Sequence, residues 1–364
     1  MSIIVAVLVF GLIVLIHEFG HFIVAKKCGI GVIEFSIGMG PRVWSFEKGE
    51  TRYSLKLLPF GGSCMMLGED ENESDPKAFN NKSVWARIAV VFAGPLFNFL
   101  LAMVLGIIIV HAVGFDSPTL TDVQPGFSAE EQGMQAGDVI TKLNHEPVVV
   151  YRDITIYMML HPSDPVDVEF KRLAADGVTW EKHTVTLTPR YSDENGRYML
   201  GIVVSGRYTK AQGIGETLKY GIYEMVYSVK TTIKSLGMMI HGQVGRDDVA
   251  GPVRMVSMID ETVEETIPYG MSAVILTLMN LCMLLSANLG VMNLLPIPAL
   301  DGGRLVFLII EAIRGKVFLI LEVLRGRPID KEKEGMVHMA GMAALMVLMG
   351  LVLFNDISIL FKGV

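Results

Sequence analysis

Four segments of the chain are long and apolar enough to cross a membrane, and this constrains the fold more than any other feature. Spanning the hydrocarbon core takes about 20 mostly apolar helical residues. The candidate segments run from Ile3 to Ala25, from Val84 to Val113, from Met271 to Leu295 and from Met336 to Phe361. Only 19% of the residues are charged and 51% are hydrophobic. We therefore expect a polytopic α-helical membrane protein with four transmembrane helices.

The overall charge excludes one class of partner. The formal net charge is −7, so the chain offers no basic surface that would neutralise phosphates, and no nucleic-acid partner is expected. The first apolar segment could also be a cleaved signal peptide. That alternative fits poorly, because no basic residue precedes the segment and no small-residue cleavage site follows it.

The positions of the basic residues predict the orientation in the membrane. Lys26 and Lys27 directly follow the first span, whereas no Lys or Arg precedes it. The loop between the third and fourth spans carries seven Lys or Arg residues. Because loops rich in Lys and Arg stay in the cytoplasm, both loops should be cytoplasmic. Both termini and the long segment between the second and third spans should then be extracytoplasmic.

That long segment, 115–208, has the pattern of a folded domain. The residues from Val166 to Phe170 and from His183 to Leu187 alternate between apolar and polar, as in half-buried strands. Gly137-Asp138-Val139-Ile140, preceded by Ser128-Ala129 and Gly133, resembles the core motif of bacterial PDZ domains. The resemblance implies an α+β domain that binds an extended peptide by adding it to a sheet edge. A plain spacer domain is the alternative.

Two further segments are neither spans nor simple loops. Phe35 to Gly38 and Tyr53 to Leu57 alternate at period two around a turn, which predicts a β-hairpin. Sheet backbone at membrane depth must be covered by protein or line a wet cavity, so this hairpin should border a site. Periodic apolar residues between 215 and 267 indicate amphipathic helices. A fifth span at 220–240 is disfavoured by its charged residues.

The expected organisation is thus a series of membrane segments with one large insert. Transmembrane helices cover 1–27, 84–114, 271–303 and 336–364. The remaining stretches are a membrane-associated β-hairpin region on the cytoplasmic side at 28–83, a PDZ-like domain at 115–208, connecting amphipathic helices at 209–270 and a cytoplasmic loop at 304–335.

The first span contains the residues of a metal site. His17-Glu18-Phe19-Gly20-His21 is an H-E-x-x-H sequence, and residues four apart share one face of a helix. His17 and His21 can therefore bind one zinc ion, with Glu18 beside it as the general base that activates water. Inserting a carboxylate into an apolar helix costs about 2 kcal/mol or more. A structural histidine would explain only one of the three polar residues.

A third protein ligand is expected from elsewhere, because catalytic zinc usually has three. The best candidate is Asp301, which follows the third span in Asn293-Leu-Leu-Pro-Ile-Pro-Ala-Leu-Asp301-Gly-Gly. Two prolines break the helix there and free backbone groups that could meet an extended peptide. The alternative for Asp301 is a solvated loop acid or a helix cap.

Together these motifs resemble the site-two protease family. The resemblance rests on His17 to His21 in the first span, on Phe92-Ala93-Gly94-Pro95 with Asn98 in the second, and on the motif from Asn293 to Gly303. The sequence of the predicted hairpin region from Glu34 to Asp70 is similar to that of the bacterial branch of these intramembrane zinc metalloproteases. The similarity covers nearly the whole chain.

The resemblance implies both the site and its biological setting. His17, His21 and Asp301 would bind Zn²⁺, Glu18 would be the catalytic residue, and Asn288, Asn293 and Pro298 would bind the substrate. The substrates would be single-span membrane proteins such as anti-sigma factors, or remnant signal peptides, cleaved in regulated intramembrane proteolysis. The PDZ-like domain would bind a peptide or a substrate end. The protein would lie in the inner membrane of a bacterium, its active site toward the cytoplasm.

Two other functions are compatible with single features of the sequence. Intramembrane His and acidic residues also line the pathways of ion transporters, but those contain internal repeats that we do not find here. A catalytically inactive PDZ scaffold is the second alternative. It has no need for the polar residues at 17, 18 and 21, whose insertion into the membrane is costly.

Overall fold

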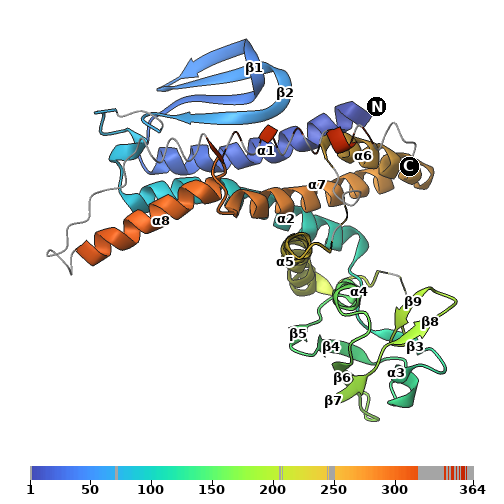
Figure 1. Ribbon diagram of the computed structural model, residues 1–364. Helices are drawn as coiled ribbons and strands as arrows, with labels where there is room; N and C mark the ends of the chain where they lie inside the picture. The colour runs from blue at the N-terminus through green and yellow to red at the C-terminus, as the bar shows by residue number, and fades with distance from the viewer. Residues whose placement is uncertain are drawn as a thin grey trace. The chain divides into compact units, whose positions relative to one another are not determined.

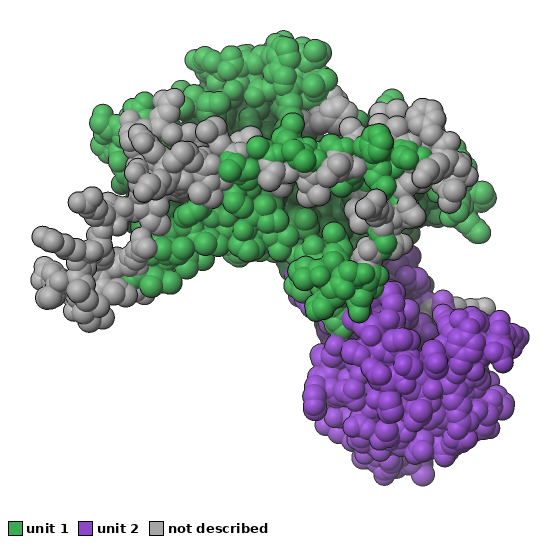
Figure 2. Space-filling view, viewed as in Figure 1, with its two compact units in different colours: residues 1–105, 228–364 green, residues 106–227 purple. Residues whose placement is uncertain are grey.

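The computed structural model describes most of the chain as two compact units. Residues 1–105 and 228–364 form the first unit, and residues 106–227 form the second (Figure 2). The predicted fourth span and the part of the predicted loop beyond Phe318 lie largely outside the described residues. The described residues are 2–69, 73–204, 206, 208–243, 245, 251–318 and scattered positions between 340 and 358.

Three helices are long and apolar enough to span a membrane within the described ranges. They are α1 (Ser2–Lys27), α2 (Val84–Val113) and α7 (Met271–Leu294). They coincide with three of the four predicted spans, and the protein is therefore membrane-integral. Helix α5 (Gly213–Ile240) is amphipathic and does not qualify as a span. Helix α6 (Pro252–Thr266) packs against α1 and α7, and short 3-10 turns occur at Phe79–Asn81 and Ile267–Tyr269.

The predicted hairpin is a pair of long, bent strands, β1 (Val32–Lys48) and β2 (Thr51–Met66), which lie over α1 (Figure 1). Gly38 and Gly40 adopt positive φ angles of 85° and 86°, which a residue with a Cβ adopts only with strain. This bend folds the strand back, so residues 34–37 pair with both 52–55 and 62–65. As a result, residues 62–66 lie at one edge of the sheet.

A short turn interrupts the helical chain after the third span. Helix α7 ends at Leu294, and helix α8 (Asp301–Phe318) begins after a turn that contains Pro296 and Pro298. In this turn Ala299 has a φ of 79°, a strained value for a residue with a side chain. The stretch predicted as a cytoplasmic loop from 304 therefore begins as helix α8, because its apolar residues recur at helical spacing.

The second unit is built around a four-stranded antiparallel sheet with the order β5-β4-β6-β7. The predicted strands at 166–170 and 183–187 are present as parts of β6 and β7 and pair with each other. A separate pair, β10-β3, lies in the same unit. The elements are β3 (Leu120–Val123), α3 (Ser128–Glu131), β4 (Val139–Leu143), β5 (Glu146–Pro147), α4 (Tyr151–Leu160), β6 (Val166–Leu173), β7 (Trp180–Leu187), β8 (Arg190–Ser192), β9 (Arg197–Met199) and β10 (Ile202–Val204).

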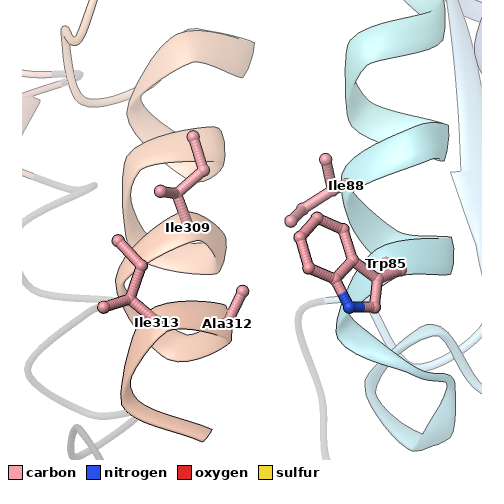
Figure 3. A pocket seen from close by; sticks show the side chains of 5 residues that line it. All are labelled: Trp85, Ile88, Ile309, Ala312 and Ile313. Atoms are coloured by element: carbon pink, nitrogen blue, oxygen red, sulfur yellow. The ribbon is translucent and has the colours of Figure 1, made fainter. Parts of the chain in front are cut away.

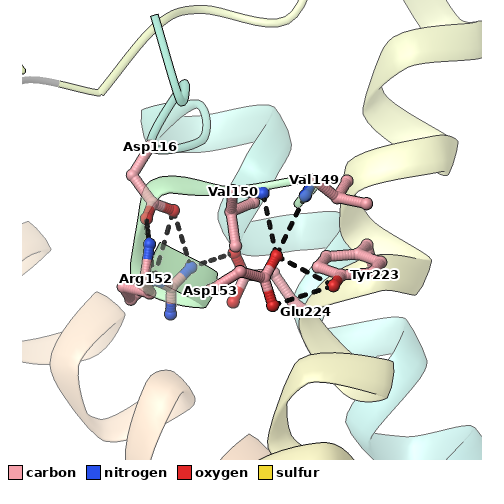
Figure 4. A network of polar contacts seen from close by, with 7 residues as sticks. All are labelled: Asp116, Val149, Val150, Arg152, Asp153, Tyr223 and Glu224. Carbon is pink, nitrogen blue, oxygen red and sulfur yellow. Dashed lines mark hydrogen bonds and ion pairs between the residues drawn. The ribbon is translucent and has the colours of Figure 1, made fainter. Parts of the chain in front are cut away.

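An ionic cluster joins α4 to the first half of α5 inside this unit (Figure 4). Arg152 donates to both carboxylate oxygens of Asp116, at 2.9 and 3.1 Å, and to Glu224 at 2.5 Å. Next to it, the hydroxyl of Tyr223 donates to Asp153, which also accepts from the backbone N–H groups of residues 149 and 150. Burial and the charge of Asp153 raise the pKa of Tyr223, so its hydroxyl stays a donor.

Candidate metal centre

The two histidines of α1 lie where their four-residue spacing predicts. Both side chains are buried, and their Nε2 atoms lie 3.2 Å apart. The imidazole rings are nearly perpendicular, at an interplanar angle of 84°. Perpendicular rings with converging Nε2 atoms suit two ligands of a single ion and leave no room for ring stacking.

Asp301, the first residue of α8, joins them. Its Oδ2 lies 3.2 Å from Nε2 of His17 and 3.4 Å from Nε2 of His21. These are the three residues whose donor atoms cluster closely enough to hold a metal ion in the described part of the chain. The carboxylate at the start of α8 therefore lies against α1.

The donor set fits zinc in both spacing and chemistry. A tetrahedral zinc ion with ligands at about 2.0–2.1 Å needs donor atoms about 3.3 Å apart. The three separations here, 3.2, 3.2 and 3.4 Å, match that edge length. In addition, Oδ2 of Asp301 is buried, yet no described group gives it a hydrogen bond. A buried carboxylate oxygen needs a compensating partner, and a cation is the partner that this donor set suits.

Helix α2 supports the two imidazoles from behind. The main-chain oxygen of Val90 lies 2.8 Å from Nδ1 of His21, and Nδ2 of Asn98 lies 3.2 Å from Nδ1 of His17. Between them, a Cβ at Gly94 would overlap with His21 and crowd His17. Only glycine allows the α2 backbone to come this close to both rings.

The side chain of Glu18, a residue of α1, lies against the sheet. Its side chain is half-buried, and a Cβ at Gly62 would lie 3.3 Å from its Cγ. Gly62, the first residue of the edge segment 62–66, therefore lies against the side chain that follows His17. This segment lies beyond the two alternating stretches, 35–38 and 53–57, from which the hairpin was predicted.

The three predicted substrate-binding residues have different surroundings. Asn288 is half-buried in α7, and its Oδ1 accepts a hydrogen bond from the hydroxyl of Thr232 in α5. Asn293 is half-buried in the last turn of α7, before the strained turn. Pro298 lies within that turn and packs close to Gly303. Asn288 thus already uses its amide oxygen inside the protein, and Asn293 and Pro298 lie nearer to Asp301 in sequence.

The sequence indicated Gly94 and Asn98 as helix-packing residues that could also support the site, and it did not identify Val90. Val90, Gly94 and Asn98 are spaced four apart on α2, as His17 and His21 are on α1. That matching period was a usable signal for Gly94 and Asn98. The contribution of Val90 is its backbone oxygen, which no side-chain pattern reveals.

The sheet carries an ion pair of its own. Arg42 donates two hydrogen bonds to Glu34, at 2.7 and 3.2 Å, and Ser54 donates a third at 2.6 Å. The hydrogen bond from Arg42 is the main reason that the pKa of Glu34 falls to about 2, against the opposing effect of burial. Glu34 is therefore ionised, and both of its carboxylate oxygens accept hydrogen bonds within the sheet.

An apolar hollow in the same unit carries none of the groups found at the metal centre. It has a volume of about 90 Å³ and is lined by residues of α2 and α8 (Figure 3). The lining residues are Trp85, Ile88, Ile309, Ala312 and Ile313. Since none of them carries a nucleophile, an acid or a metal ligand, this hollow is not a candidate active site.

Comparison with known proteins agrees with the chemistry of this centre. The model of peptidase family M50 matches residues 5–348. A Clostridium acetobutylicum protein that carries the name of a zinc metalloprotease is 38% identical, over 98% of this chain and 97% of its own. The zinc metalloprotease RasP of Geobacillus kaustophilus is 31% identical, over 99% and 98%. The regulator of sigma-W protease RasP of Bacillus subtilis is 30% identical, over 99% of each chain.

Proposed function

The chain belongs to peptidase family M50, the site-two protease family of zinc metalloproteases, and from this membership we propose that it cleaves single-span membrane proteins within or near the bilayer. Its cofactor is Zn²⁺. The anti-sigma factors that keep sigma factors inactive are the proposed substrate class, with remnant signal peptides as a second. The name of the Bacillus subtilis relative, a regulator of sigma-W protease, supports the first class.

The proposed ligands are His17, His21 and Asp301, and the convergence of their donor atoms carries this proposal. Bound zinc supplies a Lewis acid for the scissile carbonyl and lowers the pKa of water. Glu18, adjacent to His17, accepts the proton of the attacking water and later passes it to the leaving amine. Its side chain is half-buried, so it is partly shielded from solvent and still accessible to a substrate.

The substrate must reach Glu18 as an extended strand. In a helix the scissile carbonyl is hydrogen-bonded and crowded by its neighbours, so the substrate has to unwind locally. Among the described residues, the edge segment 62–66 pairs with other strand residues on one side only, and its Gly62 lies against Glu18. We propose that it takes up the unwound substrate by strand addition. Asn293 and Pro298, next to the strained turn, would hold the other side of the substrate.

The second unit is proposed to act as a PDZ-like peptide-binding domain. Its short helices and antiparallel strands are compatible with this function, as is the motif from Gly137 to Ile140 in the sequence. The proposed location is the inner membrane of a bacterium, with the second unit and both termini outside the cytoplasm. The basic residues after α1 support that orientation.

The proposal is tested by a paired cleavage assay with the full chain purified in detergent. A truncated single-span protein serves as the substrate, with and without a zinc chelator. We expect the wild type to cleave it and the chelator to stop cleavage. Glu18→Gln should keep stoichiometric zinc but lose cleavage, whereas His21→Ala should lose both, because only the second change removes a ligand.

Three outcomes would contradict the proposal. Cleavage that survives Glu18→Gln would exclude Glu18 as the general base. Bound zinc without cleavage of any single-span substrate offered would favour the scaffold function. Zinc uptake into sealed vesicles without proteolysis would favour a transporter.

A further inference from the structure

Helix α2 presents one face to the two histidines, and this face determines which imidazole nitrogen is available. The Val90 oxygen meets Nδ1 of His21, and the Asn98 amide meets Nδ1 of His17. In both rings Nε2 points to the other ring and to Asp301. The two Nδ1 atoms thus face α2, and the two Nε2 atoms face the metal centre.

A neutral imidazole carries one N–H, so the partner of Nδ1 decides whether Nε2 can bind a metal. If Nδ1 is protonated, Nε2 keeps its lone pair. The Val90 oxygen can only accept a hydrogen bond, and His21 is therefore held in the metal-binding tautomer. His17 has a side-chain amide in the equivalent place, and an amide can either donate or accept.

The orientation of the Asn98 amide decides whether its nitrogen or its oxygen faces Nδ1 of His17. With Nδ2 toward His17, the amide donates to Nδ1 and would force the proton onto Nε2, the atom that faces Asp301. Meanwhile Oδ1 of Asn98 is buried without a hydrogen-bond partner among the described residues. Rotating the amide by half a turn exchanges two groups of nearly equal shape. Oδ1 then accepts from the Nδ1–H of His17.

Everything else about Asn98 is fixed by packing. The residue is fully buried, and its main-chain oxygen accepts a hydrogen bond of 2.9 Å from the hydroxyl of Ser286 in α7. One polar atom of the amide lacks a partner in either orientation. The rotation therefore costs no hydrogen bond, and it replaces two opposed donors by a donor and an acceptor when Nε2 is a ligand.

We propose that Asn98 is a positioning residue that holds His17 in the tautomer with a free Nε2, through a hydrogen bond from Nδ1–H of His17 to Oδ1 of Asn98. It acts through His17 and touches neither the metal nor the substrate. This inference rests on the metal site of the proposed function. It explains why a buried amide persists at this position of an apolar helix, where it would otherwise be costly.

The test is the zinc affinity of the full chain in detergent, measured by competition with a chelator of known affinity. Asn98→Leu has a similar volume but no acceptor, and we expect its affinity for zinc to fall by about 10- to 100-fold. Asn98→Asp keeps an acceptor at the same place and should stay within a few-fold of the wild type. Ser286→Ala is the matched control, because it removes a hydrogen bond to the same residue without changing the amide.

The electronic spectrum of the cobalt-substituted protein is the second measurement. Asn98→Leu should change its absorption bands, while Asn98→Asp and Ser286→Ala should leave them nearly as in the wild type. Equal zinc affinity in Asn98→Leu and the wild type would overturn the proposal. So would an equal loss in Asn98→Asp, which would show that the amide N–H matters, or in Ser286→Ala, which would show that helix packing matters.

A substitute variant and a separate readout for the proposed function keep the result decisive. If Asn98→Leu does not fold, Asn98→Ser takes its place with the same expectations, because its hydroxyl is too short to reach His17. Failure of the proposed function is seen separately: the wild type would then bind zinc but not cleave. The affinity comparison among the Asn98 variants is independent of cleavage.

Discussion

The two buried polar clusters of this protein differ in how completely their atoms are paired. In the second unit, Arg152 connects Asp116 and Glu224, and Asp153 accepts from Tyr223 and from two backbone N–H groups. At the metal centre, His17, His21 and Asp301 converge, yet Oδ2 of Asp301 has no hydrogen bond from a described group. Both clusters contain carboxylates and lie mostly away from solvent.

The difference indicates different roles. A cluster whose charges are paired within the protein is complete and acts as a structural clamp. A cluster whose donor atoms all point at one place without pairing needs something from outside. The same residue types can therefore be assigned to structure or to chemistry by asking which of their polar atoms lack partners. Three predictions test this distinction.

The largest effect is expected for Asp301→Asn. Loss of the anionic ligand should reduce cleavage by about 1000-fold or more and lower the zinc content, since metal catalysis is worth several kcal/mol. The metal-free protein should unfold at nearly the same temperature as the metal-free wild type, because Asp301 is partly exposed and an amide at this position can still accept a hydrogen bond from a histidine. Metal analysis, a cleavage assay and thermal unfolding in chelator measure these quantities. A strongly destabilised metal-free variant would show that Asp301 is structural.

Arg152→Met should have the opposite pattern, with a loss of stability. It removes the arginine that pairs with the carboxylates of Asp116 and Glu224, which should lower the free energy of unfolding of the second unit by about 3 kcal/mol. Urea unfolding can be followed by the fluorescence of Trp180 in a Trp44→Phe, Trp85→Phe background. Zinc content should not change.

The control for this prediction is another arginine of the same unit. Arg190 pairs with Glu131 on the surface, where both side chains are about half exposed. Arg190→Met should therefore cost at most about 1 kcal/mol. Equal effects of the two substitutions would show that the ionic cluster is no stronger than a surface pair.

The smallest effect concerns Glu34, a paired carboxylate in the same unit as the metal centre. Its pKa is lowered from 4.5 to about 2 in the folded protein. Its contribution to stability is therefore complete above pH 4.5 and is lost as the pH falls toward 2. Arg42 is half exposed, and screening by solvent should limit the contribution to about 1–2 kcal/mol.

The measurement compares urea unfolding at pH 6 and pH 2.5, followed by Trp44 fluorescence with the other two tryptophans replaced. Glu34→Gln should be less stable at pH 6 and lose less stability on acidification than the wild type. Glu47→Gln removes a pair with the exposed Arg52, and it should lose as much stability on acidification as the wild type. Identical acid sensitivity of the wild type and Glu34→Gln would contradict the prediction.

Much of the architecture was predictable because it depends on local patterns. Apolar length predicted the three described spans, and the alternation of residues predicted strands β6 and β7. The predicted hairpin was less complete, because alternation alone does not show that residues 34–37 pair on both sides. The segment after Arg304 was misread as a loop, since its basic residues obscured the helical period of α8.

The sequence by itself determined the chemistry available in the first span. A helix places residues four apart on one face, so His17 and His21 had to lie together wherever α1 packs. It also determined that a carboxylate follows a proline-broken turn at Asp301. Such features are set by neighbours along the chain.

Only the tertiary structure decided which groups meet these histidines. The approach of Asp301, the Val90 carbonyl and the Asn98 amide depends on how α8 and α2 pack against α1. Gly94 allows that approach, but a glycine in an apolar helix does not indicate what will approach it. Contacts between distant segments depend on the shape of whole packed surfaces, and backbone acceptors are the same in every residue. Local sequence patterns therefore cannot specify them.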